Sequence, residues 1–361
     1  MDDDPSALLD IIDSSWTPCA NVPPGQFRHI FRLQANVLKG GRLVLCAVYN
    51  HMAIDGTAFH IILQALAFCC QSHADPECLA GVLDQQVTGR KMLFDRLKKV
   101  SGKRNPSAAS NNVPTSPVPQ EPYTEPPPQT KKAVSLVARN IEILKIACNK
   151  VAPHGLRFTT NDIITTLLWL SISRASIVSG DRCAVVAIPV SLRQRSKTPL
   201  PAQYMGTTMQ LVNVRCEWEQ LVQRLSVTPL NNQPMQPAEA FLELATLIRQ
   251  GILAADDASF DRLIAEVGSR DDWRQLSFSP PDLFISSHMF SSWSEMDFGP
   301  HLGVVRSFIP DAKQPNAVVI CPRRATAQGD VFDVMLHVAK ARMASLQQDP
   351  LMRWAMGVGE S

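Results

Sequence analysis

The chain has 361 residues, of which 45% are hydrophobic, so it can bury a large core as two domains or as one large α/β unit. Its 35 basic and 33 acidic residues are mixed in sequence and leave a net charge of +2, which argues against a nucleic-acid or anionic-membrane partner. No apolar run approaches the roughly 18 residues that a membrane-spanning helix needs.

The nine cysteines are odd in number, scattered and free of CxxC spacing. This pattern predicts buried thiols in a reducing compartment, with neither a disulfide framework nor a zinc site. The first 15 residues are acidic and lack the basic-then-apolar order of a signal peptide. We therefore expect a cytoplasmic protein.

Residues 27–49 predict a pair of strands. Residues 27–36 alternate crudely between apolar and polar, residues 39–42 (KGGR) form a hairpin turn, and residues 43–49 (LVLCAVY) are apolar on both faces. The second strand is therefore expected inside a sheet that is covered on both sides. Asp55 then stands at the N-cap of a helix whose residues 59–70 are apolar most of the way round, which predicts a buried helix.

A proline-rich stretch divides the chain. Residues 105–130 are rich in Pro, Ser and Asn and cannot bury enough apolar area to offset the entropy cost of ordering. We expect residues 101–132 to form a disordered crossover linker. It would connect an N-terminal domain, residues 1–100, to a C-terminal domain, residues 133–361.

The C-terminal part alternates between apolar strands and helices, which predicts an α/β fold. Its clearest helix follows a capping pattern formed by Thr159 and Asp162. The other expected elements are strands at residues 131–138, 183–190, 207–214, 283–287, 316–321 and 331–338, and helices at residues 141–151, 237–255 and 339–346.

His51, Asp55 and Gly56 form the pattern HxxxDG directly after the predicted buried strand. A lone histidine there is a satisfied structural residue, a metal ligand paired with Asp55, or a general base that takes a proton from an alcohol or amine. Asp55 is better placed to cap the following helix or to pair with an arginine, and Gly56 lets the backbone turn tightly. The sequence has neither a Gly-x-Ser-x-Gly elbow nor a phosphate-binding glycine loop, which argues against a hydrolase or a nucleotide-dependent enzyme.

A second motif lies far downstream. Asp297, Phe298 and Gly299 match the magnesium loop of kinases, but the other kinase loops are missing from the sequence. Together, HxxxDG and DFG resemble two signatures of the BAHD acyltransferases, CoA-dependent enzymes distantly related to the condensation domains of peptide synthetases. Three further segments are similar to family motifs, namely residues 159–169 to ST-x-N-D…W, residues 191–195 to D-x-R-x-R and residues 204–207 to Y-x-G-N. The five motifs follow the family order over residues 28–346. Their sequences are similar to those of the fungal branch that includes the trichothecene acetyltransferases.

The resemblance implies a two-domain α/β fold of the chloramphenicol acetyltransferase-like type, with mixed sheets, flanking helices and a solvent channel between the domains. It makes His51 the general base for direct attack of a hydroxyl or amine on a thioester, and it pairs Asp55 with Arg193. Gly56, Asp297, Phe298 and Gly299 would be structural, and Trp293, Tyr204 and Thr207 would line the channel or the CoA side. Acyl-CoA would be the co-substrate of a monomer that acylates a small secondary metabolite, with no tightly bound cofactor and no metal.

The sequence departs from the family pattern at several positions. Asn50 stands where relatives often carry a second histidine, Ser191 replaces an aspartate, Thr207 replaces an asparagine, and Pro300 follows DFG where plant members have tryptophan. His51 also lies much nearer the start than in relatives, so the N-terminal domain is expected to be incomplete.

Two alternatives to an active acyltransferase stay open. One is a catalytically inactive homologue that acts as a binding protein, which the short N-terminal part favours and the intact HxxxDG pattern opposes. The other is a condensation-like domain that uses carrier-protein thioesters. Those domains usually carry two adjacent histidines and lack the DFG segment, so Asn50 and Asp297 count against it.

Overall fold

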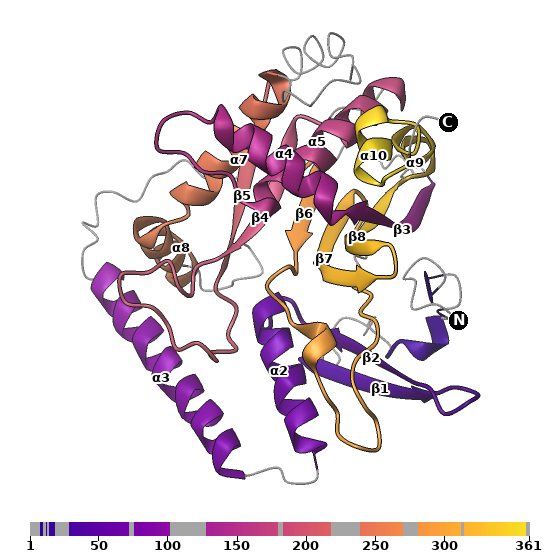
Figure 1. The fold of residues 1–361 in the computed structure, drawn as a ribbon. Helices are drawn as coiled ribbons and strands as arrows, with labels where there is room; N and C mark the ends of the chain where they lie inside the picture. Colours follow the sequence, from indigo (N-terminus) through magenta and orange to yellow (C-terminus); the bar gives the residue numbers. More distant parts are fainter. Residues whose placement is uncertain are drawn as a thin grey trace.

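The computed structural model describes residues 8–9, 12, 14–18, 29–71, 76–101, 128–179, 183–217, 239–269, 281–311 and 314–358. Most of the predicted linker, residues 102–127, lies outside this part of the chain. The described elements form a two-stranded sheet, a six-stranded mixed sheet and flanking helices, which is an α/β architecture (Figure 1). No helix in these ranges is long and apolar enough to cross a bilayer.

The N-terminal part begins with the predicted hairpin. Strands β1 (Phe31–Val37) and β2 (Leu43–Tyr49) pair antiparallel, and the turn between them needs Gly40 and Gly41, whose φ angles are +83° and +75°. Every residue of β2 is only half-buried, and β1 is its single partner among the described strands. The prediction of a strand covered on both faces is therefore wrong for the described chain.

Two helices follow the hairpin. α2 (Gly56–Cys69) was predicted, but only part of it is buried, and Cys69 is exposed. α3 (Pro76–Ser101) was not predicted, because its charged residues resembled the approach to a linker. It is a 26-residue helix with proline in its first turn, and its Arg96 donates hydrogen bonds to Asp257 (2.8 Å) and Asp261 (2.6 Å) of the C-terminal part.

The six-stranded sheet has the order β3-β8-β7-β6-β4-β5. Its strands are β3 (Gln129–Val137), β4 (Val185–Ser191), β5 (Met209–Arg215), β6 (Leu283–Ser287), β7 (Ala317–Thr326) and β8 (Gly329–Ala339). All six were expected within a few residues. β3, however, begins at Gln129, so the last residues assigned to the linker belong to the sheet. β6 runs parallel to both neighbours, so the carboxyl ends of β4 and β6 meet at one edge.

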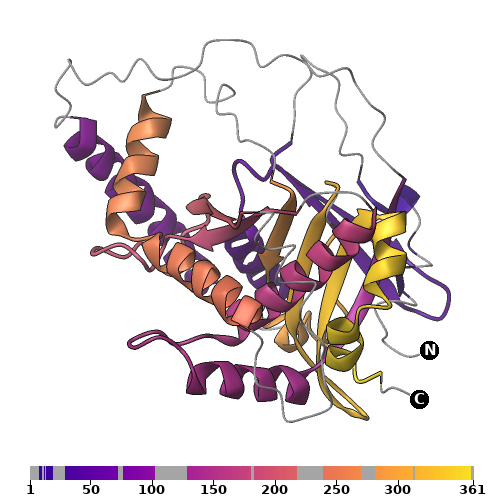
Figure 2. The ribbon, with the colours of Figure 1, turned by 90° about the horizontal axis from the view of Figure 1, so that it is seen from above.

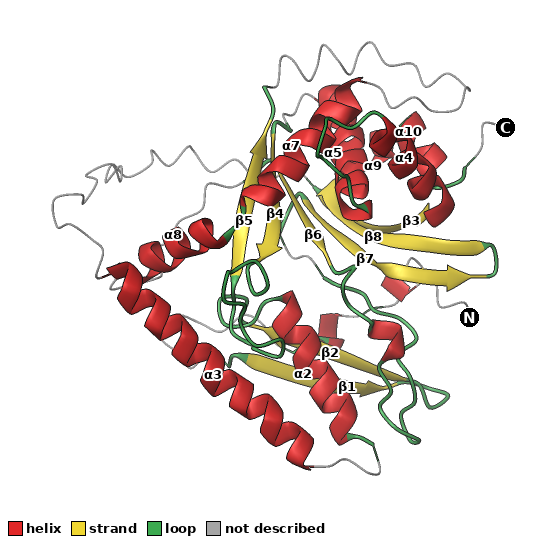
Figure 3. Ribbon diagram, turned by 60° about the vertical axis from the view of Figure 1, so that its left-hand side comes forward, coloured by secondary structure: helices red, strands yellow, loops and turns green. Residues whose placement is uncertain are grey.

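The helices of the C-terminal part gather on one side of this sheet (Figures 2 and 3). They are α4 (Ala138–Lys150), α5 (Thr160–Ser179), α7 (Glu239–Ala254), α9 (Lys340–Leu346) and α10 (Pro350–Ala355), while α8 (Asp257–Gly268) packs against α3. Neither α8 nor α10 was predicted. The predicted capping pattern of α5 is present, because the Thr159 amide donates to Asp162 (2.8 Å) and the Asp162 amide donates to the Thr159 hydroxyl (3.3 Å).

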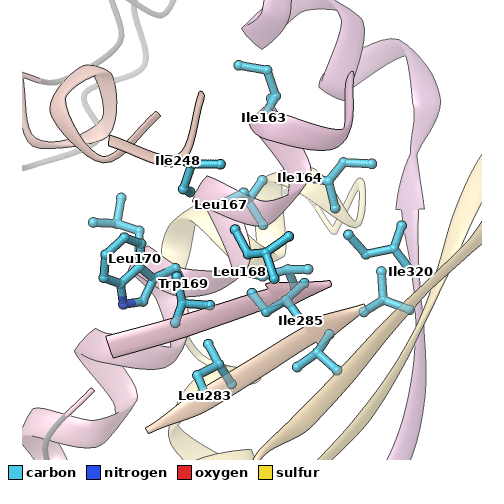
Figure 4. Close-up of a cluster of buried hydrophobic side chains, with 14 of the residues drawn as sticks. Ile163, Ile164, Leu167, Leu168, Trp169, Leu170, Ile248, Leu283, Ile285 and Ile320 are labelled. Carbon is cyan, nitrogen blue, oxygen red and sulfur yellow. The ribbon is translucent and has the colours of Figure 1, made fainter. Parts of the chain in front are cut away.

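α5 forms the centre of the main core. Its apolar residues pack over β6 and β7, as Figure 4 shows for Ile164, Leu167 and Leu168 above Leu283, Ile285 and Ile320. The fully buried Trp169 keeps its one polar group satisfied by donating from Nε1 to the Cys183 carbonyl (2.8 Å). Four of the described cysteines are buried free thiols, as expected, namely Cys148, Cys183, Cys216 and Cys321.

The segment after β6 joins the two parts of the molecule. It leaves the large sheet, runs down beside α2 and passes close to the small sheet, where it includes the 3-10 helix η4 (Trp293–Glu295) (Figure 1). Its Trp293, Met296 and Phe298 form one buried cluster with Ile54 and Phe59 of the N-terminal part. The C-terminal part therefore supplies much of the core around α2.

Candidate active site

His51 lies in a tight turn between β2 and α2, with its side chain exposed. Asn50 shapes this turn, because its backbone carbonyl accepts from the Ile54 amide (3.0 Å) and its side-chain oxygen accepts from the Met52 amide (3.0 Å). The Thr207 hydroxyl donates to the His51 carbonyl (3.4 Å). No described polar group is hydrogen-bonded to the His51 ring, so the imidazole is available to a bound molecule.

Asp55 is buried, and both oxygens of its carboxylate are engaged in hydrogen bonds. Oδ1 accepts from the Ala58 amide (2.9 Å) and thereby caps α2, while Oδ2 accepts from the Thr208 amide (3.2 Å). The guanidinium of Arg193 binds both oxygens, at 2.7 and 2.8 Å. The expected ion pair is thus present, and Asp55 serves as helix cap and ion-pair partner at once.

Arg193 has all of its N–H donors satisfied although its side chain is only 3% exposed. Besides the two bonds to Asp55, Nε donates to the Tyr204 carbonyl (3.1 Å), Nη2 to the Gly206 carbonyl (2.7 Å) and Nη1 to the Ser191 hydroxyl (3.4 Å). Complete hydrogen bonding of this kind is what makes a buried ion pair tolerable. The pair therefore fixes the start of α2 against the end of β4.

The Asp297-Phe298-Gly299 turn is packed against the other end of α2. Asp297 accepts from the Gly299 amide (2.9 Å), and its carbonyl accepts from the Gln71 side chain (3.2 Å). Gly299 has φ +82°, and a Cβ there would lie 2.6 Å from the Cys70 carbonyl oxygen. Only glycine fits this contact.

The length of α2 separates the two motifs. Its 14 residues span about 20 Å at 1.5 Å per residue. His51 precedes the first turn of this helix, whereas Gly299 contacts the residue that follows its last turn. The DFG turn therefore cannot touch a group that reacts at His51, and its contribution is to hold α2 in place.

A small pocket of about 70 Å³ opens beside His51 at the junction of the two parts. The N-terminal part contributes the turn and the start of α2, and the C-terminal part contributes the ends of β4, β5 and β6. The lining residues are His51, Asp55, Gly56, Thr57, Pro189, Ser191, Met209, Phe284, Ser286, Ser287, His288 and Phe290. The pocket is thus assembled from residues far apart in sequence.

His288 is the residue of this pocket that sequence reasoning missed. It follows β6 directly, and its Cε1 would lie 3.0 Å from a Cβ placed on Gly56. Burial, with smaller contributions from His51 and His60, lowers the pKa of His288 to about 4. No motif marks a histidine at this position, so the only available signal was its place at a strand end.

Two other expected channel residues lie elsewhere. The buried ring of Tyr204 fills the space between Gly89 of α3 and Gly206, and burial is the main cause that raises its pKa. Trp293 is buried among aromatic rings, stacked on Phe308 with centroids 4.1 Å apart. Neither residue lines the pocket beside His51.

The described residues contain no group of three or more His, Cys, Asp or Glu side chains that could hold a metal ion. Arg193 and backbone amides also occupy both oxygens of the Asp55 carboxylate, which leaves it poorly placed to share an ion with His51. What this geometry offers is an imidazole without a hydrogen-bond partner among the described residues, at a small pocket lined by both parts of the molecule.

A model of the Transferase family matches residues 14–352. The chain therefore belongs to this family of acyltransferases, the BAHD enzymes.

Curated relatives from fungi align along nearly the whole chain. The fumigaclavine B O-acetyltransferase of Aspergillus fumigatus is 28% identical over an alignment that covers 96% of this chain and 76% of the relative. The communesin N16 acyltransferase of Penicillium expansum is 25% identical, with the same coverage of both chains.

Solved structures show the same fold. The F. sporotrichioides TRI101 complex with coenzyme A and T-2 superposes with a TM-score of 0.68 at 17% identity, covering 93% of this chain and 71% of that one. Vinorine synthase superposes with a TM-score of 0.58, also at 17% identity, covering 98% of this chain and 72% of that one. The expected acyltransferase fold is confirmed.

Proposed function

We propose that this acyltransferase moves an acetyl group from acetyl-CoA to a hydroxyl group of a fungal secondary metabolite, with His51 as the general base. One observation carries the proposal. The His51 imidazole is unblocked at a pocket between the two parts of the molecule, while the Asp55 carboxylate and the His51 carbonyl are engaged in hydrogen bonds that hold the turn.

The reaction needs one proton acceptor and no covalent enzyme intermediate. The neutral His51 imidazole takes the proton of the acceptor hydroxyl as the oxygen attacks the thioester carbonyl carbon. The resulting tetrahedral oxyanion collapses, the carbon–sulfur bond breaks, and the His51 imidazolium returns its proton to the departing CoA thiolate. Asp55 takes no part in proton transfer, because Arg193 holds its carboxylate.

The nature of the substrates is inferred from the relatives and the pocket. Several relatives are named O-acetyltransferases and two of them are named for fumigaclavine B, which favours a hydroxyl on fumigaclavine B or a similar fungal metabolite. The pocket of about 70 Å³ favours a short acyl group. We further propose a monomeric, cytoplasmic enzyme that uses acyl-CoA as co-substrate and holds no tightly bound cofactor.

The two alternatives receive less support. A carrier-protein-dependent condensation domain does not fit the named fungal relatives, which are O-acetyltransferases and an acyltransferase. An inactive binding protein has no need of the hydrogen bonds that hold the His51 turn.

The test is product formation. Purified protein is incubated with acetyl-CoA and a panel of alcohols that includes fumigaclavine B, and acetylated products are identified by mass spectrometry. We expect an acetyl ester from wild type and, with His51→Ala, a rate lower by about 10²- to 10⁴-fold. Met52→Ala, at the exposed neighbouring position, serves as the matched control. Equal rates for wild type and His51→Ala contradict the proposed mechanism.

A further inference from the structure

Buried polar atoms without hydrogen-bond partners concentrate beside α2. They are His288 Nδ1, Ser291 Oγ and Trp293 Nε1 in the segment after β6, and His60 Nδ1 on the facing side of the helix. Buried polar groups in native proteins are nearly always hydrogen-bonded, so such a concentration requires an explanation. Of these four residues, His288 is the one that also lines the pocket beside His51.

Packing alone holds the His288 ring. Its backbone amide donates to the Ile320 carbonyl (2.8 Å), which continues the pairing of β6 with β7. The ring lies stacked on Phe290, with centroids 5.9 Å apart, and 5.8 Å from Phe308, while Gly56 leaves room for its Cε1 edge. No described polar group is hydrogen-bonded to either ring nitrogen. The ring is therefore enclosed by side chains and keeps its hydrogen-bonding capacity free.

The surroundings keep this ring uncharged at neutral pH. Burial is the main cause of the low pKa of His288, about 4, and the nearby His51 and His60 add to it. The carboxylate of Asp55, which also lines the pocket, is neutralised by Arg193. A neutral imidazole carries one N–H. We assign it to Nε2, because a buried N–H without an acceptor at Nδ1 is rarer in proteins than a buried acceptor without a donor.

We propose that His288 is a second catalytic residue, which donates a hydrogen bond from Nε2 to the carbonyl oxygen of the bound thioester. The bond strengthens as that oxygen becomes an oxyanion, and no proton moves. His51 and His288 come from different parts of the molecule and share one pocket, so one ring serves the attacking hydroxyl and the other serves the carbonyl oxygen. This role rests on the proposed function.

A hydrogen-bond donor fits His288 better than a second base does. A group with a pKa near 4 is a weak proton acceptor at neutral pH, since the best general bases have pKa values near the working pH. A fixed neutral donor, in contrast, needs no ionisation, and removal of one such donor typically lowers kcat by about 10²- to 10³-fold.

The kinetic test compares variants by release of the CoA thiol from acetyl-CoA, with water or fumigaclavine B as acceptor. His288→Phe keeps a flat ring but lacks the donor, and we expect kcat to fall about 100-fold while KM for acetyl-CoA stays within about threefold. His288→Asn restores an N–H donor and should recover at least tenfold of the loss. His60→Phe, in the same aromatic cluster but outside the pocket, should keep the kcat of wild type.

A second measurement does not depend on turnover. Histidine-labelled protein in the His51→Ala background is examined by NMR, with the His288 signal assigned from its absence in His288→Phe. Acetyl-CoA should move the His288 N–H resonance downfield, and CoA alone should not.

Distinct results overturn the inference and the proposed function. The inference is overturned by His288→Phe with a kcat within threefold of wild type, by His288→Asn no better than His288→Phe, or by an N–H resonance that ignores acetyl-CoA. Absence of any acetylated product from wild type overturns the proposed function instead, and the NMR result then still decides whether His288 meets the thioester.

Discussion

The two ends of α2 carry the two motifs of the chain and are built in opposite ways. At the Gly299 end the turn is held by hydrogen bonds from the Gly299 amide and the Gln71 side chain to Asp297, and a backbone contact leaves no room for a single extra carbon. At the His51 end two imidazoles have no hydrogen-bond partner among the described residues and a pocket lies between them. The Gly299 end is thus the closed end of α2, and the His51 end, where the reaction is proposed to take place, is the open end.

The largest loss of stability is expected when one member of the buried ion pair is removed. Asp55→Ala leaves the Arg193 guanidinium buried without a counter-charge and deletes the cap of α2, so the free energy of unfolding should fall by about 3–5 kcal/mol in urea titrations. Asp330→Ala, which breaks the exposed pair with Arg323, is the matched control and should cost at most about 1 kcal/mol.

A double variant sharpens this prediction. Combining Asp55→Ala with Arg193→Met removes both charges, and we expect part of the lost stability to return. A double variant that is less stable than Asp55→Ala alone contradicts the assignment of the loss to an unpaired charge.

The closed end should respond to a single methyl group. Gly299→Ala forces a Cβ to within 2.6 Å of the Cys70 carbonyl oxygen at a φ of +82°, so we expect a loss of about 2–3 kcal/mol in the free energy of unfolding with kcat changed less than threefold. Gly303→Ala has a similar φ, +75°, but open space around it, and should lose only about 1 kcal/mol. If Gly299→Ala abolished turnover while remaining folded, the separation of the two ends would be wrong.

The open end should make stability depend on pH. The pKa of His288 is about 4 in the folded protein and near 6.5 when unfolded, so the unfolded chain binds the extra proton between these values. The stability that depends on the neutral His288 ring is then fully present above about pH 6.5, and it falls as the pH drops toward 4. At pH 5 the resulting loss in the free energy of unfolding is on the order of 1–2 kcal/mol. Urea titrations at pH 7 and pH 5 should show a smaller pH effect in His288→Phe than in wild type.

The smallest effect is expected from the bond that supports the catalytic turn. Thr207→Val deletes the hydroxyl that donates to the His51 carbonyl at 3.4 Å, and a long, partly exposed bond of this kind contributes about 0.5–1 kcal/mol. We expect a fall of a few degrees in the thermal midpoint and a twofold to fivefold lower kcat. An unchanged KM for acetyl-CoA would show that the turn, rather than CoA binding, is affected.

The sequence was informative wherever local chemistry decides the structure. The Thr159 and Asp162 cap, the strand at residues 283–287 and the HxxxDG turn all follow from short-range patterns. α3 was missed because its packing partners, α8 and the residues around Tyr204, lie far along the chain.

The candidate active site shows the same limit, because only the residues whose roles follow from local sequence could be predicted. Asp55 was correctly expected to cap a helix or pair with an arginine, because both roles belong to a carboxylate at that position. His288 could not be recognised, because its importance comes from the parallel pairing of β4 and β6, which brings two strand ends to the start of α2. The half-burial of β2 was missed for a similar reason, since apolar content does not reveal how many neighbours a strand has.

The ion pair between Asp55 and Arg193 also sets an order of events during synthesis. The two residues are 138 positions apart, so at ordinary elongation rates the aspartate leaves the ribosome on the order of ten seconds before its arginine. During that interval the cap of α2 lacks its counter-charge and the segment after β6 has not yet been made. The nascent chain therefore carries its histidine early but gains a working site late, once the large sheet has formed.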